Sequence, residues 1–244
     1  MKKYMAALLL STCIFGFSSQ AAAQKSVPIL MYHSIDEFKG SGIRDLYVSP
    51  KSFEQQMKYL KDNGYTLLTF ERWDEVNKVK KPIFVTFDDG YKNLWNAFSV
   101  FQKLKDDTFQ PVGTIFAISD FLTKPKRLSG PELLEMSNSK LFSIQSHTAT
   151  HPDLRSTPNS EYELKESKEK LESITGKPVI ALAYPFGFFD DRVIAETKNY
   201  YKFAVTVKPG LFKETGRPDD FYRMPRVFVT YDMTLKQFAE ALRK

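Results

Sequence analysis

The stretch Pro82-Ile83-Phe84-Val85-Thr86-Phe87-Asp88-Asp89-Gly90 joins a short apolar run to two adjacent carboxylates. The apolar run is rich in aromatic and β-branched residues and ends at a glycine turn, so it predicts a buried strand over residues 82–87. Adjacent side chains at a strand end point in different directions. One aspartate could therefore face a metal ion while its neighbour faces a substrate. An ordinary Asp-Gly turn would explain the same letters if they stood alone.

A second apolar run, residues 141–145, leads into His147-Thr148-Ala149-Thr150-His151, which contains two of the chain's three histidines. Pro152 disfavours a helix at His151, so the pattern predicts a loop after a strand, shaped in part by its threonine hydroxyls. Two solvated loop histidines are the simple alternative. Together with Asp88 and Asp89, however, the pair supplies what a metal-dependent hydrolase needs: two imidazoles and a carboxylate for the ion, and a second carboxylate for proton transfer.

Apolar runs of strand length alternate with helical patterns along most of the chain. The predicted strands are 27–32, 65–69, 82–87, 111–118, 141–145, 179–184, 203–207 and 226–230, and the predicted helices are 50–63, 70–77, 94–104, 130–136, 160–175, 190–199 and 234–242. This alternation implies parallel βαβ units in a single α/β domain, barrel-like but incomplete or distorted. In such barrels chemistry takes place where strands end and loops begin. The longest irregular piece, residues 33–48, is predicted to be a mobile surface loop.

The first 23 residues have the pattern of a secretory signal peptide. Lys2 and Lys3 precede an apolar stretch over residues 5–17, and residues 21–23 are three alanines that suit cleavage. The apolar stretch is shorter than the roughly 20 residues of a membrane-spanning helix, which disfavours the alternative of an uncleaved anchor. We therefore expect a signal peptide over 1–23, a catalytic domain over 24–244, and no stable membrane span after cleavage.

Composition narrows the chemistry of the mature chain. The hydrophobic fraction of the full sequence, 42%, supports a packed core. Cys13, the only cysteine, lies in the segment to be removed, so a metal would have to be bound by His, Asp or Glu. The formal charge of +6 falls to +4 without Lys2 and Lys3, since 33 basic and 29 acidic residues remain. A modestly basic exported protein could favour an anionic envelope or polymer, whereas the lack of a long basic run does not indicate nucleic-acid binding.

Three further positions near predicted strand ends are candidates. His33 ends the first strand and could transfer protons near neutral pH, although a lone histidine is more often structural. Ala183-Tyr184-Pro185-Phe186-Gly187 follows the sixth strand. The backbone N–H of Phe186 could serve as an oxyanion donor, and Tyr184 and Pro185 are further candidates for binding substrate. The aromatic side chains of this segment could stack on sugars or simply edge the core. Arg223 and Arg226 flank Met224-Pro225 and could orient a carboxylate, or form surface salt bridges.

These motifs resemble the polysaccharide deacetylases of carbohydrate esterase family 4, which carry the NodB-homology domain. Residues 86–90 match the family's T-F-D-D-G motif at every position, and residues 147–151 match its H-[ST]-x-x-H motif. The resemblance spans residues 27–229 and implies a distorted (β/α)7 barrel. It implies that Asp88 is the general base and that Asp89, His147 and His151 bind a metal, usually zinc and sometimes cobalt or nickel.

The chain departs from the family pattern in its later motifs. Residues 183–187 resemble the R-x-P-Y motif, but Ala183 replaces Arg and Phe186 replaces Tyr, a change that leaves a backbone oxyanion donor intact. The late L-x-H motif is missing. In this the chain is similar to the subgroup acting on poly-β-1,6-N-acetylglucosamine, where a Met-Tyr-His segment brings the general acid. Residues 31–33 match that segment, which implies that His33 is the acid. The resemblance also implies that Arg226, or failing that Arg223, takes the displaced arginine's role.

The sequence therefore predicts metal-dependent removal of N-acetyl groups from an N-acetylglucosamine polysaccharide, with release of acetate, by a secreted or periplasmic monomer. Peptidoglycan, chitin oligomers or acetylated xylan are alternative substrates. A catalytically inactive carbohydrate-binding relative is a further alternative. A retaining glycosidase is disfavoured, because adjacent aspartates are poorly placed to flank a glycosidic bond across roughly 5 Å.

Overall fold

The structure is a computed structural model that describes residues 25–158 and 160–243. The predicted signal peptide and its cleavage site lie outside the described residues. Seven parallel strands form a closed barrel: β1 (Ile29–Tyr32), β5 (Pro82–Phe87), β6 (Gly113–Ala117), β7 (Phe142–Ser146), β8 (Ala181–Ala183), β9 (Phe203–Pro209) and β10 (Met224–Phe228). The barrel closes because β1 pairs with β10 on one side and with β5 on the other. The predicted distorted (β/α)7 barrel is confirmed.

The distortion is visible at β5, which has three neighbours. β4 (Thr66–Leu68) pairs with the first half of β5, where Leu67 lies opposite Ile83. β6 pairs with the second half, where Phe87 lies opposite Ile115. The eighth strand therefore lies beside the ring of seven rather than within it. The carboxyl end of β5 remains free to line the rim of the barrel.

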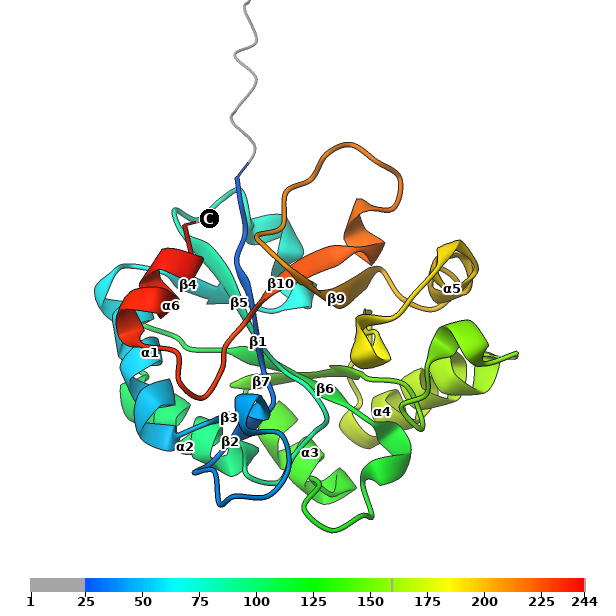
Figure 1. Ribbon diagram of the computed structural model, residues 1–244, viewed down its shortest axis with the longest axis horizontal. Coiled ribbons are helices and arrows are strands. Elements are labelled where there is room, and N and C mark those ends of the chain that lie inside the picture. Colours follow the sequence, from blue (N-terminus) through cyan, green and yellow to red (C-terminus); the bar gives the residue numbers. More distant parts are fainter. Residues whose placement is uncertain (1–24, 159, 244) are drawn as a thin grey trace, which may run out of the picture.

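Helices cover the outside of the strands (Figure 1), with α1, α2 and α6 on one side and α4 and α5 on the other. Their bounds are α1 (Pro50–Asp62), α2 (Leu94–Leu104), α3 (Gly130–Asn138), α4 (Ser167–Thr175), α5 (Asp191–Thr197) and α6 (Leu235–Ala241). Polar caps fix where they begin. Ser129 and Glu132 form a capping box at the start of α3. In the described part of the chain, no helix has the length and apolar character needed to cross a membrane.

Three segments differ from the sequence prediction. The predicted helix at 70–77 is a 3-10 helix, η2 (Phe70–Glu75), interrupted by non-helical backbone at Arg72. The predicted helix at 160–175 begins with a π-helical turn, η5 (Tyr162–Glu166), before α4. The predicted loop at 33–48 contains two short paired strands, β2 (Ser34–Ile35) and β3 (Tyr47–Val48). Strands of two residues are too short to leave a period in the sequence.

Alternation along β5 explains how the fold places its site. Ile83, Val85 and Phe87 pack in the larger core cluster, together with residues of the surrounding helices. Phe84 belongs instead to a smaller cluster with residues of β1, β8, β9 and β10, inside the barrel. Since side chains alternate along a strand, Asp88 continues the inward-facing series at the point where the strand ends. A carboxylate is thereby directed into the mouth of the barrel.

Short helical turns complete the rim. They are η1 (Arg44–Leu46), η3 (Ser119–Phe121), η4 (Leu154–Ser156) and η6 (Pro185–Gly187), whereas η7 (Asp220–Tyr222) precedes β10 at the opposite, amino end of the barrel. Several follow a barrel strand directly, as η6 follows β8. The loops that carry polar side chains are therefore short and tied to the strands.

Candidate active site

The candidate residues gather where parallel strands end. His33 follows β1, the Asp88-Asp89 pair follows β5, and His147 follows β7. Arg226 reaches the same region from within β10. Because the carboxyl ends of parallel strands share one rim, four separate parts of the sequence meet there.

Asp89, His147 and His151 form a compact group that could hold a metal ion. The Nε2 atoms of both histidines lie 3.7 Å from Oδ1 of Asp89. One ligand atom from each of the three side chains can be chosen so that all lie within 4.8 Å of one another. One carboxylate and two imidazoles are a donor set that zinc and similar divalent cations accept.

The ring of His147 is oriented by the backbone of β8. Its Nδ1 lies 2.7 Å from the carbonyl oxygen of Ala183, so Nδ1 carries the proton and donates it. The lone pair of Nε2 then faces Asp89. His147 is also buried and its own backbone N–H donates to the carbonyl of Ala117. This imidazole is held in the tautomer and orientation that a metal ligand needs.

His151 reaches the same point from a tightly folded loop. Thr148 and His151 both have φ of +66°, a region that side-chain-bearing residues seldom adopt. The Thr148 hydroxyl stabilises the turn by accepting a hydrogen bond from the His151 N–H at 3.0 Å. Burial, and next the neighbouring His147, lower the pKa of His151 to about 4. Its imidazole is therefore neutral at neutral pH and available as a ligand.

Glu163, which the sequence analysis missed, holds the other side of this loop. Its carboxylate accepts hydrogen bonds from the Thr150 N–H at 2.8 Å and from the Thr150 hydroxyl at 2.5 Å. Its backbone carbonyl accepts a third bond from the Ala149 N–H. Glu163 is buried within the π-helical turn η5. An acidic residue in a charged helical segment gives no sequence signal of this role.

Asp88 forms a buried bidentate pair with Arg226. The guanidinium Nη1 and Nη2 atoms lie 2.7 Å from the two carboxylate oxygens. Arg226 also donates from Nε to the carbonyl of Thr206 and from Nη1 to the Thr86 hydroxyl, which fix its plane. Burial alone would raise the pKa of Asp88, but the charge and hydrogen bonds of Arg226 outweigh it and hold the pKa well below its usual range. Asp88 is therefore an ionised, rigidly oriented carboxylate at neutral pH.

Arg223, the second candidate for this role, is placed elsewhere. It is half exposed and forms ion pairs with Asp191 and Asp219 on the outer surface. The prediction that Arg223 could orient the catalytic carboxylate is wrong. Arg223 precedes β10, whereas Arg226 lies within it and on the side that faces Asp88.

His33 lies close enough to this group to respond to its charges. Burial lowers the pKa of His33, whereas the negative charges of Asp88 and Asp89 act in the opposite direction. The ring packs edge-on against Phe228, with centroids 5.9 Å apart. Its Nδ1 is buried and has no hydrogen-bond partner among the described residues. His33 is therefore a titratable side chain at the site, and its Nδ1 atom makes no hydrogen bond that would hold the fold together.

The turn after β8 has one aromatic ring exposed at the site and another buried in the core. Phe186 has φ of +59° and is 53% exposed, and its ring lies edge-on to His151 with centroids 4.6 Å apart. Tyr184 is fully buried and stacks on Phe189, and Pro185 is buried as well. Of the proposed sugar-stacking wall, Phe186 presents its ring at the site, and the exposed Phe188 packs against Phe186 with ring centroids 5.8 Å apart. The Tyr184 and Pro185 side chains belong to the core, which corrects their assignment as side-chain contacts of substrate.

Arg127 is a second residue that the sequence analysis missed. Its Nη1 donates to the backbone carbonyl of Asp89 at 2.6 Å, and its guanidinium lies 4.0 Å from the ring centre of Tyr91. Asp89 has φ of +71°, so this contact supports backbone that is unfavourable for a residue other than glycine. Arg127 comes from the loop before α3 and has no motif of its own.

The barrel and its site define a class of protein. They are those of an α/β-barrel hydrolase, with an Asp-His-His group suited to a divalent cation and a second, ion-paired carboxylate beside it.

Comparisons with known proteins agree with this class. The family model of polysaccharide deacetylases matches residues 75–203. The YxkH protein of Bacillus subtilis, which carries the name of a polysaccharide deacetylase, is 33% identical over 221 residues, covering 87% of this chain and 74% of its own. The poly-β-1,6-N-acetyl-D-glucosamine N-deacetylase of Staphylococcus epidermidis is 28% identical over 212 residues, covering 78% and 70%.

A solved structure of a polysaccharide deacetylase from Bacillus cereus superimposes with a TM-score of 0.89 at 60% identity, covering 90% of this chain and 69% of the other. The chain belongs to the polysaccharide deacetylase family.

Proposed function

We propose that this protein hydrolyses N-acetyl groups of an N-acetylglucosamine-containing polysaccharide and releases acetate, with a divalent metal held by Asp89, His147 and His151. The observation that carries the proposal is the placement of an oriented, ionised carboxylate, Asp88, beside a group of three metal-ligand side chains. The similarity to the Staphylococcus epidermidis enzyme supports poly-β-1,6-N-acetylglucosamine as the polymer.

The residues fit a metal on their own geometry. The Nδ1 atom of His147 donates to the carbonyl of Ala183, so the neutral ring has its lone pair on Nε2, which faces Asp89. Zinc suits this donor set first, and cobalt or nickel would also be accepted. A bound cation would supply Lewis-acid chemistry, polarising the acyl carbonyl and lowering the pKa of a water molecule.

The chain's own side chains supply the proton transfers. Asp88, held by Arg226, accepts a proton from the water that attacks the acyl carbon. The backbone N–H of Phe186, in the strained turn after β8, is the proposed donor to the developing oxyanion. When the C–N bond breaks, His33 protonates the departing amine. Acetate and a glucosamine unit are the products.

The substrate and the metal requirement can be tested together. We expect metal-stripped protein to lose acetate release from poly-β-1,6-N-acetylglucosamine, and zinc or cobalt to restore it, because only Asp89 and two imidazoles would hold the ion. The measurement is enzymatic detection of free acetate over a panel that also contains peptidoglycan, chitin oligomers and acetylated xylan. Release from another polymer alone would reassign the substrate. No release from any polymer by the metal-restored protein would indicate an inactive, carbohydrate-binding relative.

We also propose that the protein is exported, acts in the periplasm or outside the cell, and works as a monomer. The amino-terminal sequence pattern supports export, since its basic and apolar parts precede three small residues. The site is formed within one chain, because all of its candidate residues meet in one barrel. A second copy is therefore not needed to complete it.

Glu163 should be needed for metal affinity because it fixes the loop that carries His151. We expect Glu163→Ala to weaken zinc binding by about 10–100-fold, as loss of a residue that supports a metal ligand commonly does. The measurement is competition with a chromogenic chelator. Glu166→Ala is the matched control, since Glu166 lies three residues further along the same turn but is exposed. Equal zinc affinities for the two variants would contradict this role.

A further inference from the structure

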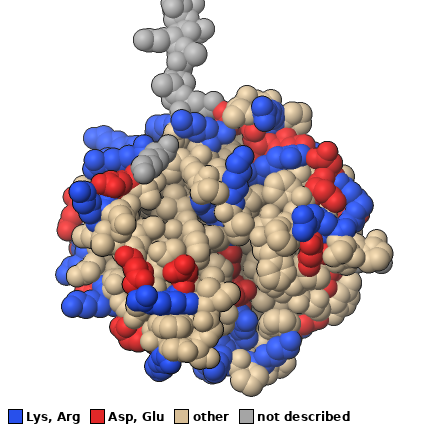
Figure 2. Space-filling model, in the orientation of Figure 1, with Lys and Arg blue, Asp and Glu red and all other residues tan. Residues whose placement is uncertain are grey.

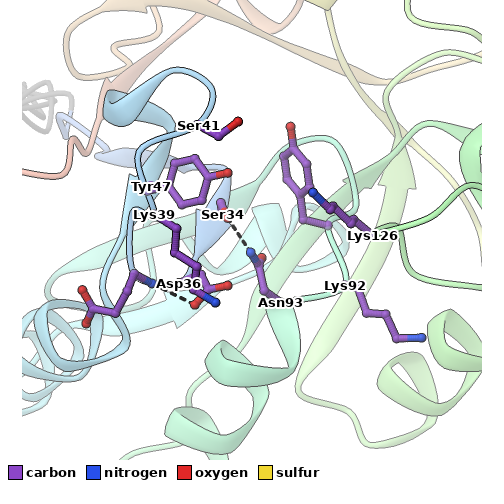
Figure 3. Close-up of a pocket in the computed structure, with 10 residues that line it drawn as sticks. Ser34, Asp36, Lys39, Ser41, Tyr47, Lys92, Asn93 and Lys126 are labelled. Carbon is purple, nitrogen blue, oxygen red and sulfur yellow. Dashed lines mark hydrogen bonds between the residues drawn. The ribbon is translucent and has the colours of Figure 1, made fainter.

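A large cavity lies beside the metal-ligand group and plays no part in the steps described above. Its volume is about 540 Å³, within the range of small-ligand sites. Its lining comes from β2, the segment from β2 to β3, the turn after β5 and the loop before α3: Ser34, Asp36, Glu37, Lys39, Ser41, Tyr47, Tyr91, Lys92, Asn93 and Lys126. Figure 3 shows Tyr47, Lys39 and Ser41 on one side and Lys92 and Lys126 on the other, with Asn93 bonded to Ser34 between them.

The β2–β3 wall of this cavity is held in place from two directions. From α2, the Asn96 amide donates to the carbonyl of Ile35 at 2.8 Å. From the loop after β10, Tyr231 packs against Phe38, whose ring also packs against Tyr47. Arg44 adds an ion pair with Asp232 at 2.7 Å. These contacts join the wall to the barrel, so the cavity is largely formed before a ligand arrives.

Tyr91 connects the cavity to the catalytic group. It follows the Asp88-Asp89-Gly90 turn and lines the cavity. Tyr91 stands only two residues after the metal-ligand residue Asp89. Arg127 covers the Tyr91 ring and bonds to the backbone of Asp89. A molecule in this cavity would therefore adjoin the reacting N-acetyl group.

The lining has the chemistry that recognises a neutral sugar ring. Two half-buried aromatic side chains, Tyr47 and Tyr91, offer flat apolar faces, and the hydroxyl and amide groups of Ser34, Ser41 and Asn93 offer hydrogen bonds. Charge does not favour one sign, since the lining includes both carboxylates and ammonium groups. Figure 2 likewise shows Lys, Arg, Asp and Glu interspersed around a largely uncharged centre of this face.

We propose that the cavity lined by Tyr47 and Tyr91 binds the sugar unit next to the one that is deacetylated. This inference rests on the proposed function, because it assumes that the substrate is a chain of sugars. It predicts that the protein prefers oligomers to single N-acetylglucosamine units. It also assigns chain-length preference to the β2–β3 segment.

The test is the dependence of KM on chain length for N-acetylglucosamine oligomers. Tyr47→Ala should raise KM for the longer oligomers about 10-fold, as expected for loss of one aromatic contact, and leave kcat and activity on the shortest substrate unchanged. Tyr47→Phe should restore the wild-type KM because it keeps the ring. Ser41→Trp, at an exposed position of the same wall, should raise KM by filling the cavity without touching the core.

The matched control is Tyr65→Ala. Tyr65 lines a smaller cavity, of about 240 Å³, which also contains a second tyrosine and two adjacent lysines but lies at the amino ends of the strands. This variant should keep the wild-type dependence on chain length. Wild-type KM values for Tyr47→Ala and Ser41→Trp at every chain length would overturn the proposal.

A binding arm separates this inference from the proposed function. Oligomer affinity is measured by calorimetry on metal-stripped protein, in which no turnover interferes. Oligomer binding that Tyr47→Ala weakens, without acetate release from wild-type holoprotein, would overturn the proposed function and support the subsite. Acetate release by the wild-type holoprotein, together with an oligomer affinity that neither Tyr47→Ala nor Ser41→Trp changes, would support the proposed function and overturn the subsite.

Discussion

Replacing Asp88 by asparagine should lower the rate of acetate release by about 10³-fold, within the usual range for loss of a general base. Asparagine has nearly the same shape but cannot accept a proton from the attacking water. Zinc affinity should be unchanged, because the metal-ligand group consists of Asp89 and two histidines. The measurements are kcat for acetate release and metal content. Wild-type turnover in this variant would remove Asp88 from the mechanism.

The same substitution should also destabilise the protein, and this has to be separated from catalysis. Arg226 is fully buried, so asparagine at position 88 leaves a buried guanidinium without its carboxylate. Breaking such a pair costs about 3–5 kcal/mol. Thermal unfolding and circular dichroism therefore accompany the kinetics. Asp191→Asn is the matched control, since it removes the exposed partner of Arg223 and should change neither turnover nor stability measurably.

The pH dependence of that stability difference has a definite sign. The pKa of Asp88 is lowered in the folded protein, so the pair stabilises the fold fully at pH values above the ordinary aspartate pKa. The contribution is lost as the pH falls from there toward the lowered folded-state pKa. The unfolding free energies of wild type and Asp88→Asn should accordingly differ at pH 7. This difference should begin to shrink as the pH falls below about 4. Because Asp88 stays ionised above that pH, any loss of activity between pH 7 and 5 has another origin.

The sequence predicts the barrel well because its strands are short, buried and strongly patterned. The predicted bounds of β5 and α2 coincide with the observed ones. The positions of Asp88, Asp89 and His147 follow from those strands, since a parallel barrel brings their carboxyl ends together. Where the sequence pattern of a strand is clear, it also indicates where the polar residue that follows the strand lies in the barrel.

The choice between Arg223 and Arg226 depends on one strand boundary. The sequence pattern predicts a last strand that begins at Arg226, whereas β10 begins at Met224. With the observed start, Met224 and Arg226 share a face, and Met224 packs inside the barrel. The arginine that faces inward is then Arg226. A shift of two residues at a strand start was enough to leave the assignment open.

Glu163 and Arg127 could not be found in this way because their roles depend on tertiary contacts. Glu163 acts on a loop that is 13 residues away in sequence, through a π-helical turn that has no recognised pattern. Arg127 acts on a backbone carbonyl 38 residues away. Both support loops that contain residues with positive φ, and such strain appears only once the backbone is known.

Replacing His33 by glutamine should lower kcat for acetate release from the polysaccharide about 10²–10³-fold, as expected for loss of a general acid. Glutamine retains polarity and approximate size but cannot carry a proton near neutral pH. The ring nitrogen Nδ1 of His33 has no hydrogen-bond partner among the described residues, so its removal leaves no partner unsatisfied there. Zinc affinity and the unfolding temperature should therefore stay close to those of the wild type.

The pH profile should carry the signature of this histidine. Burial lowers the pKa of His33, so the imidazolium form becomes scarce as the pH rises through that lowered pKa. Wild-type activity should decline on that alkaline side. The residual activity of His33→Gln should lack this decline. A similar alkaline decline in both proteins would assign it to another group.

A substrate with a good leaving group separates the acid from the base. An amine must be protonated to depart, whereas 4-nitrophenolate departs from its acetate ester without a proton. His33→Gln should therefore hydrolyse 4-nitrophenyl acetate at nearly the wild-type rate, while Asp88→Asn should lose activity on both substrates because water must still be activated. If His33→Gln lost both activities equally, His33 would serve the site through its structure. The leaving-group dependence thus tests whether His33, which follows β1, supplies the proton to the departing amine.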